Sequence, residues 1–309
     1  MKQIKVFFYV YITSVVSLNI VLILLFLNSG YSWSGFIHYS DFVNAIDGFP
    51  GIHPMYLSMH NCIAIILVIY LLRTERFLKT GVILYIVGFS LGIGLILLLQ
   101  KGPIFALLVT STILCFKYSL QRIWAFYLII ILSMGSVVIA FPSSIQRLNT
   151  LFTVENFAGI KESAEIRKTL RSCNAPIIKE AGILGFGAGD GNEKLISCYE
   201  KVDRDLAAIS YNSHNQYVGL ILMIGLLGLL LFLFFIFFNI NHALKSGIFL
   251  PIAVIMFYAI VMFSENILER QEGVIYFSLL INLLYFLSKE NQQTVRVKNT
   301  QEEILKAMS

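Results

Sequence analysis

Charged residues are scarce in this chain of 309 residues. Asp, Glu, Lys and Arg make up only 13% of it, whereas 57% is hydrophobic. A soluble domain does not carry so much apolar surface, so the composition indicates an integral membrane protein. The formal net charge of +5 does not indicate nucleic-acid binding, because the basic residues lie mostly in short segments beside the apolar runs.

Cysteine is also rare, and the four cysteines show no CxxC spacing, which argues against a zinc site. Cys62 and Cys115 lie inside apolar runs and are most simply small core residues. Cys173 and Cys198 lie in a polar segment. If this segment lies in an oxidising compartment they can form a disulfide, and two free thiols are the alternative.

A dinucleotide-binding loop is absent as well. Residues 182–191, Gly-Ile-Leu-Gly-Phe-Gly-Ala-Gly-Asp-Gly, have the spacing G-x-G-x-G, with Asp190 where the third glycine is required. We therefore expect these glycines to form a tight turn that returns the chain to the membrane. No group of His, Asp and Glu has metal-ligand spacing, so neither a metal nor a cofactor is expected.

Apolar runs are what the sequence has in abundance, and we interpret eight of them as membrane spans. They cover residues 4–28, 54–72, 80–99, 103–117, 124–141, 216–238, 248–264 and 273–288. The predicted fold class is therefore an all-α integral membrane protein, with five transmembrane helices in residues 1–141 and three in residues 216–288.

Lys and Arg are concentrated in alternate loops, and residues 29–53 contain neither. By the positive-inside rule, one consistent topology places both termini in the cytoplasm. Residues 142–215 then form one large, partly helical loop outside the cytoplasm, within which residues 161–174 have a helical period. Residues 289–309 are expected to form a polar cytoplasmic tail.

A polar group of residues, Asn212-Ser213-His214-Asn215, directly precedes the apolar run 216–238. At about 100° per residue, His214 falls on one helical stripe with Gly225 and Gly228. Glycines on such a stripe let a neighbouring helix come close. His214 would then lie at the water boundary beside a partner helix. The alternative is an interfacial histidine that caps the helix.

Further polar residues are expected at the same membrane face: Lys101, Arg147, Arg167, Arg171, Asn215, Glu265 and Arg270. Arginines at a membrane boundary suit a substrate with a phosphate head and a lipid tail, because arginine binds phosphate bidentately. A neutral histidine can take a proton from an attacking hydroxyl. Alternatively these arginines pair with local acids, since residues 142–214 hold nine bases and nine acids.

These motifs resemble the O-antigen ligase and O-antigen polymerase superfamily of bacterial envelopes. Residues 214–215, followed nine residues later by Gly-Leu-Leu-Gly at 225–228, are similar to its His-Asn-x9-Gly-x-x-Gly signature. Arg167 precedes Gly-Phe-Gly at 185–187, as in the family's Arg…Gly-x-Gly segment, and Arg147 matches a second arginine.

Two other stretches, residues 51–56 and 265–273, look like segments of superfamily members from the Bacteroidetes. Two positions depart from the pattern. Arg171 stands where the family usually has an aromatic residue, and Lys101 where it often has the Arg of Ser-Arg-Gly. The chain also resembles a member that is shorter at its N-terminus, with the missing spans expected before residue 30.

The resemblance implies a GT-C-like, metal-independent glycosyltransferase of the bacterial inner membrane. It would take a glycan from undecaprenyl diphosphate at the periplasmic face. The acceptor would be lipid A–core in a ligase, or another lipid-linked repeat unit in a polymerase. Arg147 and Arg167 would hold the diphosphate, and His214 would activate or orient the acceptor hydroxyl.

Two readings from other classes compete with this one. A transporter is expected to place ionisable residues or broken helices near the bilayer midplane, often in repeated halves. The predicted spans are almost free of charge and show no internal repeat, which favours surface chemistry. A structural subunit of an envelope assembly would explain the spans, but not the arginines and histidine at one boundary.

Overall fold

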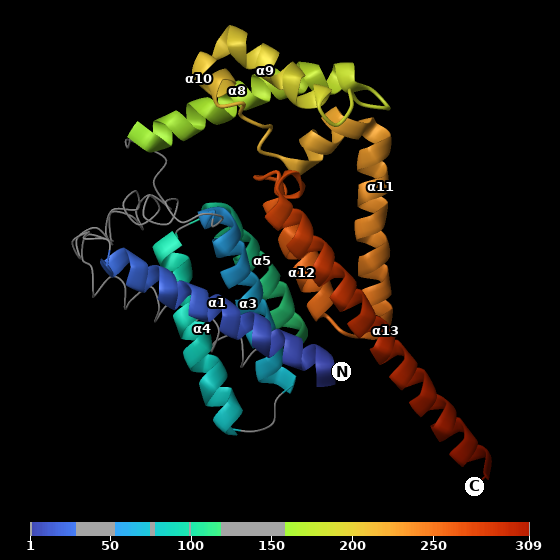
Figure 1. The fold of residues 1–309 in the computed structure, drawn as a ribbon. Coiled ribbons are helices and arrows are strands. Elements are labelled where there is room, and N and C mark those ends of the chain that lie inside the picture. The colour runs from blue at the N-terminus through green and yellow to red at the C-terminus, as the bar shows by residue number, and fades with distance from the viewer. Residues whose placement is uncertain (1, 29–52, 75–77, 99, 119–157, 309) are drawn as a thin grey trace. The chain divides into compact units, whose positions relative to one another are not determined.

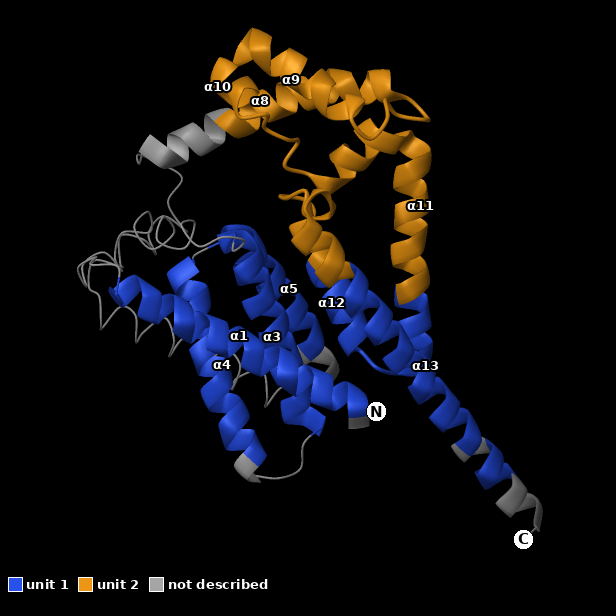
Figure 2. Ribbon diagram, in the orientation of Figure 1, with its two compact units in different colours: residues 1–151, 240–257, 278–309 blue, residues 152–239, 258–277 orange. Residues whose placement is uncertain are grey.

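A computed structural model describes residues 2–28, 53–74, 78–98, 100–118 and 158–308. Over these ranges all regular secondary structure is helical (Figure 1). The expected span at 124–141 and Arg147 lie outside the described residues. The chain forms two compact units, Met1–Leu151 with Ile240–Phe257 and Ser278–Ser309, and Phe152–Asn239 with Tyr258–Phe277 (Figure 2). We call them unit 1 and unit 2.

Unit 1 contains a bundle built around one buried helix. Its elements are α1 (Lys2–Asn28), α3 (Pro54–Thr74), α4 (Leu78–Leu98) and α5 (Lys101–Tyr118). Helix α3 packs against the other three and is buried along most of its length. It begins at Pro54, where the fixed φ of proline suits the first helical position and its missing N–H costs no hydrogen bond.

Two polar pairs lie inside this bundle. The side chains of Asn19 (α1) and Asn61 (α3) donate to one another, over 2.7 and 3.2 Å, and Asn61 also donates to the Leu57 carbonyl over 3.0 Å. Gly94 of α4 leaves room for them, because a Cβ there would lie 2.7 Å from Asn19 Nδ2. The Tyr11 hydroxyl and His60 Nδ1 form a second pair, 2.7 Å apart.

Among the described residues, five helices are long and apolar enough to cross a membrane: Gln3–Asn28, Pro54–Thr74, Thr80–Leu98, Gln216–Ser246 and Gln271–Glu303. This agrees with the expected helical membrane protein. Two more expected spans are shorter apolar helices, Lys101–Leu114 and Leu250–Val261. The run expected at 248–264 ends early as a helix, since the Met262 carbonyl accepts from the backbone N–H of Gln216 over 2.9 Å.

Unit 2 combines polar helices with parts of apolar ones. Its elements are α8 (Ala158–Ala181), α9 (Asp190–Val202), α10 (Arg204–Ala208), most of α11 (Gln216–Ser246), the end of α12 (Leu250–Val261), η2 (Ile267–Glu269) and the start of α13 (Gln271–Met308). The helix expected at 161–174 is therefore longer, and the expected polar tail continues α13 as helix.

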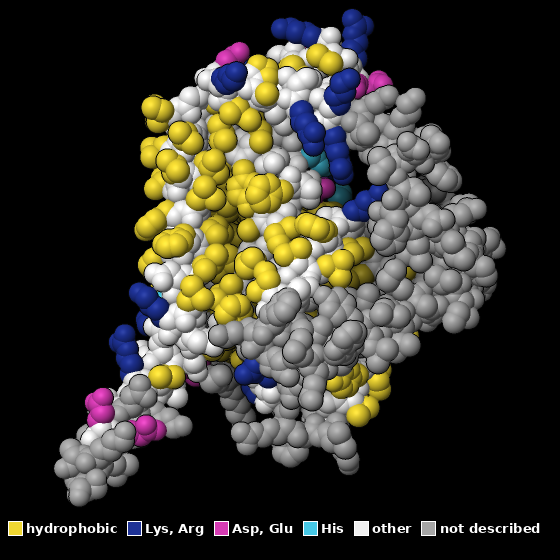
Figure 3. Space-filling model, turned by 180° about the vertical axis from the view of Figure 1, so that it is seen from behind, with side chains coloured by type: hydrophobic (Ala, Val, Ile, Leu, Met, Phe, Trp, Pro, Cys, Tyr) yellow, Lys and Arg dark blue, Asp and Glu magenta, His cyan; other side chains and the backbone are white. Residues whose placement is uncertain are grey.

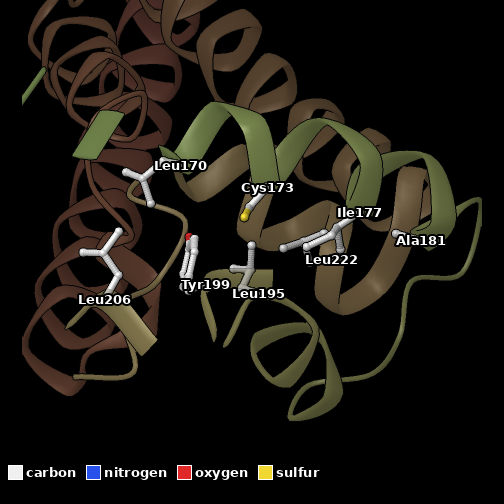
Figure 4. Packing of buried hydrophobic residues seen from close by; sticks show 8 residues of the cluster. All are labelled: Leu170, Cys173, Ile177, Ala181, Leu195, Tyr199, Leu206 and Leu222. Carbon is white, nitrogen blue, oxygen red and sulfur yellow. The ribbon is translucent and has the colours of Figure 1, made fainter. Parts of the chain in front are cut away.

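The core of unit 2 lies between α8, α9, α10 and α11. Figure 4 shows its side chains pointing toward one another: Leu170, Cys173, Ile177, Ala181, Leu195, Tyr199, Leu206 and Leu222. The positions 170, 173 and 177 recur at helical spacing, so they present one apolar stripe of α8 to this core. A disulfide joins Cys173 to Cys198, with the two Cα atoms 5.8 Å apart, and fastens α8 to α9.

The glycine-rich segment joins α8 to α9 and packs on a break in α11. Gly225 has φ 70° and ψ −172°, which no helix allows. In a continuous helix, the N–H groups of residues 226 and 227 would donate to the carbonyls of 222 and 223. Here all four groups bond to the segment instead: Phe186 N to Leu222 O, Gly187 N to Met223 O, Leu226 N to Gly182 O and Leu227 N to Ile183 O, over 2.8 to 3.1 Å.

Two expectations are corrected by this arrangement. The glycines at 182–191 do not lead directly into an apolar helix, because α9 follows them and α11 begins only at Gln216. Gly225 serves a close approach of loop backbone rather than of a neighbouring helix, because a Cβ there would lie 2.1 Å from the Ile183 carbonyl oxygen. A Cβ at Gly228 would meet the side chain of Ile224 in its own helix.

Candidate active site

Two connecting segments meet in unit 2, one before α11 and one between α12 and α13. Gln216, which is buried, donates its backbone N–H to Met262 O over 2.9 Å. Its side-chain Oε1 accepts from the backbone N–H of Leu268 over 2.6 Å. Asn215 Nδ2 donates to Phe263 O over 3.2 Å. These bonds hold the two segments together without any regular secondary structure between them.

A network of amides, buried at Asn266 and Ser213 and exposed at Glu269, strengthens this junction. Asn266 Nδ2 donates to Ser213 Oγ over 3.0 Å and also contacts Glu269 Oε1. Asn212 Nδ2 donates to Glu269 Oε2 over 3.0 Å. A Cβ at Gly219 would lie 2.8 Å from Asn266 Nδ2, so glycine makes room for the network. Both carboxylate oxygens of Glu269 have amide partners, which indicates a structural role.

His214 is held by its backbone, its ring face and one ring nitrogen. Its φ of 46° is uncommon for a residue with a side chain, and its N–H donates to Asn212 Oδ1 over 3.1 Å. The imidazole stacks on Tyr211 with ring centroids 4.4 Å apart. Nδ1 lies 3.6 Å from Glu265 Oε1, and the two side chains are 32% and 34% exposed. His214 is thus fixed but open to a ligand.

The helical stripe expected to contain His214 does not exist. Helix α11 begins at Gln216, and the break at Gly225 changes the direction of the helix below it. The cap of α11 is Asn215, whose Oδ1 accepts from the N–H groups of Tyr217 and Val218 over 3.0 and 3.1 Å. Asn215 therefore caps the helix that follows the site, and His214 is not the capping residue.

The charges of Arg167 and Glu265 act on the pKa of Tyr211 in opposite directions. Burial raises the pKa of the Tyr211 phenol, the negative charge of Glu265 raises it further, and the positive charge of Arg167 lowers it. Both charges are therefore close enough to act on this ring. Helix α8 is positioned there by Asn174, whose Nδ2 donates to Ser213 O over 3.4 Å.

The remaining candidates differ in their relation to this cluster. Arg171 is exposed on α8 one turn after Arg167, so both side chains leave the same helix face. Arg270 is exposed directly after η2. Lys101 is the exposed first residue of α5, in unit 1. Glu265 and Glu269 are not neighbours on one helix, because α12 ends at Val261, and the two carboxylates have different partners.

Sequence reasoning missed the residues that position the histidine. Tyr211, Gln216 and Asn266 belong to the motif-bearing stretches, but nothing in their spacing shows that they meet across 50 residues. Composition was the one signal for this junction in the sequence. Asparagine, serine and glutamine lie at the start of the apolar run at 216–238, and serine and asparagine lie at the end of the run at 248–264. Polar side chains that are buried at such places need hydrogen-bond partners.

The described residues thus form a helical membrane protein with a half-exposed histidine, a carboxylate and arginine at one end of an apolar helix. Residues 86–233 match the family model described as O-antigen ligase. This match includes Arg167, His214 and Gly225, and it confirms the resemblance to the O-antigen ligase superfamily. No curated protein and no solved structure matches the chain. The family supports a ligase- or polymerase-type role in surface polysaccharide synthesis.

Proposed function

We propose that the protein transfers a glycan from an undecaprenyl-diphosphate carrier to an acceptor hydroxyl at the periplasmic face of the inner membrane, as a ligase acting on lipid A–core or another surface acceptor. The observation that carries the proposal is His214, fixed between Tyr211 and Glu265 in the region that matches the O-antigen ligase family. The site is open on the remaining side of the imidazole.

His214 is the proposed base. With its proton on Nδ1, facing Glu265, the imidazole presents a lone pair at Nε2. The acceptor hydroxyl gives its proton to Nε2 while its oxygen attacks the anomeric carbon of the donor sugar, and the bond from that carbon to the phosphate oxygen breaks. Glu265 stabilises the imidazolium that results, as a carboxylate does beside a catalytic histidine.

Arg167 is the proposed partner of the leaving diphosphate, which gains negative charge as the bond breaks. A guanidinium keeps its charge at any working pH and binds phosphate through a fork of two N–H groups. Tyr211, whose phenol is kept protonated by its raised pKa, can donate to the same group. Arg171, Arg147, Lys101 and Arg270 are proposed to assist in substrate binding, and no metal is required in this scheme.

Two other functions remain candidates. A repeat-unit polymerase uses the same donor chemistry and differs only in the acceptor, so the Tyr211–His214–Glu265 arrangement supports it equally. A transporter of lipid-linked glycan, of another class, needs an energy source and leaves its cargo chemically unchanged. Membranes that consume the lipid-linked glycan without an energy source therefore favour transfer over transport.

The test is glycan transfer in cells that lack the native gene, scored beside the abundance of each variant in the membrane. His214→Ala should lower transfer at least about a hundredfold, as expected for the loss of a general base. Arg167→Lys should also lower it, because an ammonium lacks the fork that holds phosphate.

His242→Ala is the matched control. His242 also stacks on a tyrosine, Tyr285, with ring centroids 4.3 Å apart, but it lies at the other end of α11. This variant should keep full transfer. Near-normal transfer by His214→Ala at equal abundance would reduce His214 to a structural residue. Product analysis with lipid A–core supplied or withheld separates the ligase from the polymerase.

A further inference from the structure

The loop between α8 and α9 exposes two large apolar side chains at its tip. Ile183 is 67% exposed and Leu184 is 75% exposed. They follow Gly182, whose φ of 59° ends α8, and they precede Gly185, whose φ is 73°. We call residues 182–187 the glycine loop. Ile183 and Leu184 do not belong to the core of unit 2, so packing in that core does not explain why both positions are apolar.

The glycine loop lies where the exposed apolar surface of α11 begins. Its backbone is bonded to residues 222, 223, 226 and 227 of that helix. Before Ile224, the α11 side chains are buried or half-buried. From Ile224 onward most apolar side chains are exposed: Ile224, Leu226, Leu227, Leu230, Leu231, Leu233, Phe234, Phe235, Phe237 and Phe238. Figure 3 shows hydrophobic side chains covering much of the face that is drawn, with Lys and Arg side chains gathered toward its top. The tip therefore continues the lipid-facing band of α11.

The backbone of the loop is suited to an apolar environment. Irregular backbone in a membrane is tolerated only where its polar groups have partners. The carbonyls of Gly182 and Ile183 accept from α11, and the N–H groups of Gly185, Phe186 and Gly187 donate to Ala181, Leu222 and Met223. The tip can thus leave water without losing these hydrogen bonds.

The next residues have the character of a membrane boundary. Lys194 Nζ of α9 lies over the ring of Phe186, 5.5 Å from its centroid. Aromatic rings and lysines concentrate at the headgroup level, where an apolar body and a charged tip are both satisfied. Along the sequence, two exposed apolar side chains, an aromatic ring at the edge of the unit 2 core and a lysine over that ring therefore follow the end of α8.

We propose that the glycine loop is a membrane-insertion element, with Ile183 and Leu184 among the acyl chains of the leaflet nearest to His214. Phe186 and Lys194 then lie at the headgroups. Since Gln216 is nine residues before Gly225, the start of α11 is at most about 13 Å along the helix from the inserted loop. The loop would fix the height of His214 above the acyl chains.

Two other exposed apolar residues of unit 2 serve as controls. Val202 is 59% exposed and Ile209 is 66% exposed. Both lie in a segment rich in charge, with Lys201, Asp203, Arg204 and Asp205 nearby in the sequence. A side chain among these charges remains in water if the bilayer boundary is at the glycine loop.

The experiment uses the full chain in liposomes of phosphatidylethanolamine and phosphatidylglycerol. Leu184→Cys, Val202→Cys and Ile209→Cys are each made with Cys62→Ala and Cys115→Ala, and labelled with the environment-sensitive fluorophore NBD. The Cys173–Cys198 disulfide is left intact, and its detection by mass spectrometry reports folding. Lipids with a doxyl group on the acyl chain then quench labels that lie in the bilayer.

The label at 184 should emit at shorter wavelength and be quenched several-fold more than those at 202 and 209. Equal quenching at the three positions, with emission typical of water, would overturn the proposal. An unquenched label at 184, together with a disulfide-linked dimer of the unlabelled Leu184→Cys protein, would also overturn it and would show that a second copy covers the tip.

Discussion

The polar residues of the unit 1 bundle are hydrogen-bonded to one another, whereas His214 and Glu265 in unit 2 are not. In unit 1, Asn19 and Asn61 are 6% and 0% exposed, and their amides satisfy one another. In unit 2, His214 and Glu265 are each about one-third exposed, and the 3.6 Å between them exceeds a hydrogen bond. The first pair is closed, whereas the second can still accept a ligand.

The comparison shows which polar residues of a membrane protein indicate chemistry. Amides buried between helices favour helix association, since their alternative is an unsatisfied group among apolar side chains. In unit 2 this task falls to Asn266, Ser213 and Gln216, which hold the two connecting segments. The same kind of buried amide network thus supports an open histidine, and the open group is the functional candidate.

The largest expected effect comes from breaking the loop contact of unit 2 at Gly225. Gly225→Ala places a Cβ 2.1 Å from Ile183 O in a backbone conformation that only glycine adopts. We expect a loss of about 5 kcal/mol or more, from about 1–3 kcal/mol of strain plus the backbone hydrogen bonds between the loop and α11, worth about 1 kcal/mol each. Its readout is the amount of folded protein in the membrane.

The matched control is Gly247→Ala in unit 1. Gly247 also has a positive φ, 71°, but a Cβ there meets nothing within 4 Å. It should cost only about 1–2 kcal/mol, the left-handed penalty alone. Equal abundance of the two variants would show that the loop contact contributes little.

The positions of the apolar helices could be predicted, because long apolar runs have few alternatives to a helix in a membrane. The short polar helices α9 and α10 were not predicted. The end of α12 could not be predicted. Met262 and Phe263 are as apolar as the helix before them, yet they leave it so that their carbonyls can accept from Gln216 and Asn215. Such a bond joins residues nearly 50 positions apart and leaves no local pattern.

The site was predictable in its residue types but not in its geometry. The motif containing His214 and Arg167 was recognised, whereas the helical stripe assigned to His214 was wrong. The φ of 46° at His214, whose N–H donates to Asn212 Oδ1, is a local backbone feature that no periodicity reveals. Gly225 was correctly singled out for close approach, but a glycine alone does not tell whether a helix or a loop approaches.

An effect of intermediate size on stability is expected from removing the disulfide. This bond links Cys173 to Cys198 in unit 2, whereas Cys62 in unit 1 is a buried free thiol. Cys198→Ala should destabilise unit 2 by about 3 kcal/mol, the chain-entropy value for a loop of this size. Limited proteolysis should then cut between α8 and α9 at lower protease concentration. Alkylation of Cys173 and Cys198 in the unreduced native protein would contradict both the bond and an oxidising location.

The smallest effect is expected from opening the closed pair of unit 1. Asn61→Ala should destabilise the protein by about 1 kcal/mol, because hydrogen bonds between membrane helices are worth roughly 0.6 to 2 kcal/mol. A double-mutant cycle with Asn19→Ala, followed by thermal unfolding in detergent, isolates the pair. Glycan transfer per folded molecule should not change, in contrast to His214→Ala, since a satisfied amide pair offers no group to a substrate. Loss of transfer at full abundance would show that the bundle interior contributes to the reaction, and closure of a polar pair would no longer distinguish structural from functional residues.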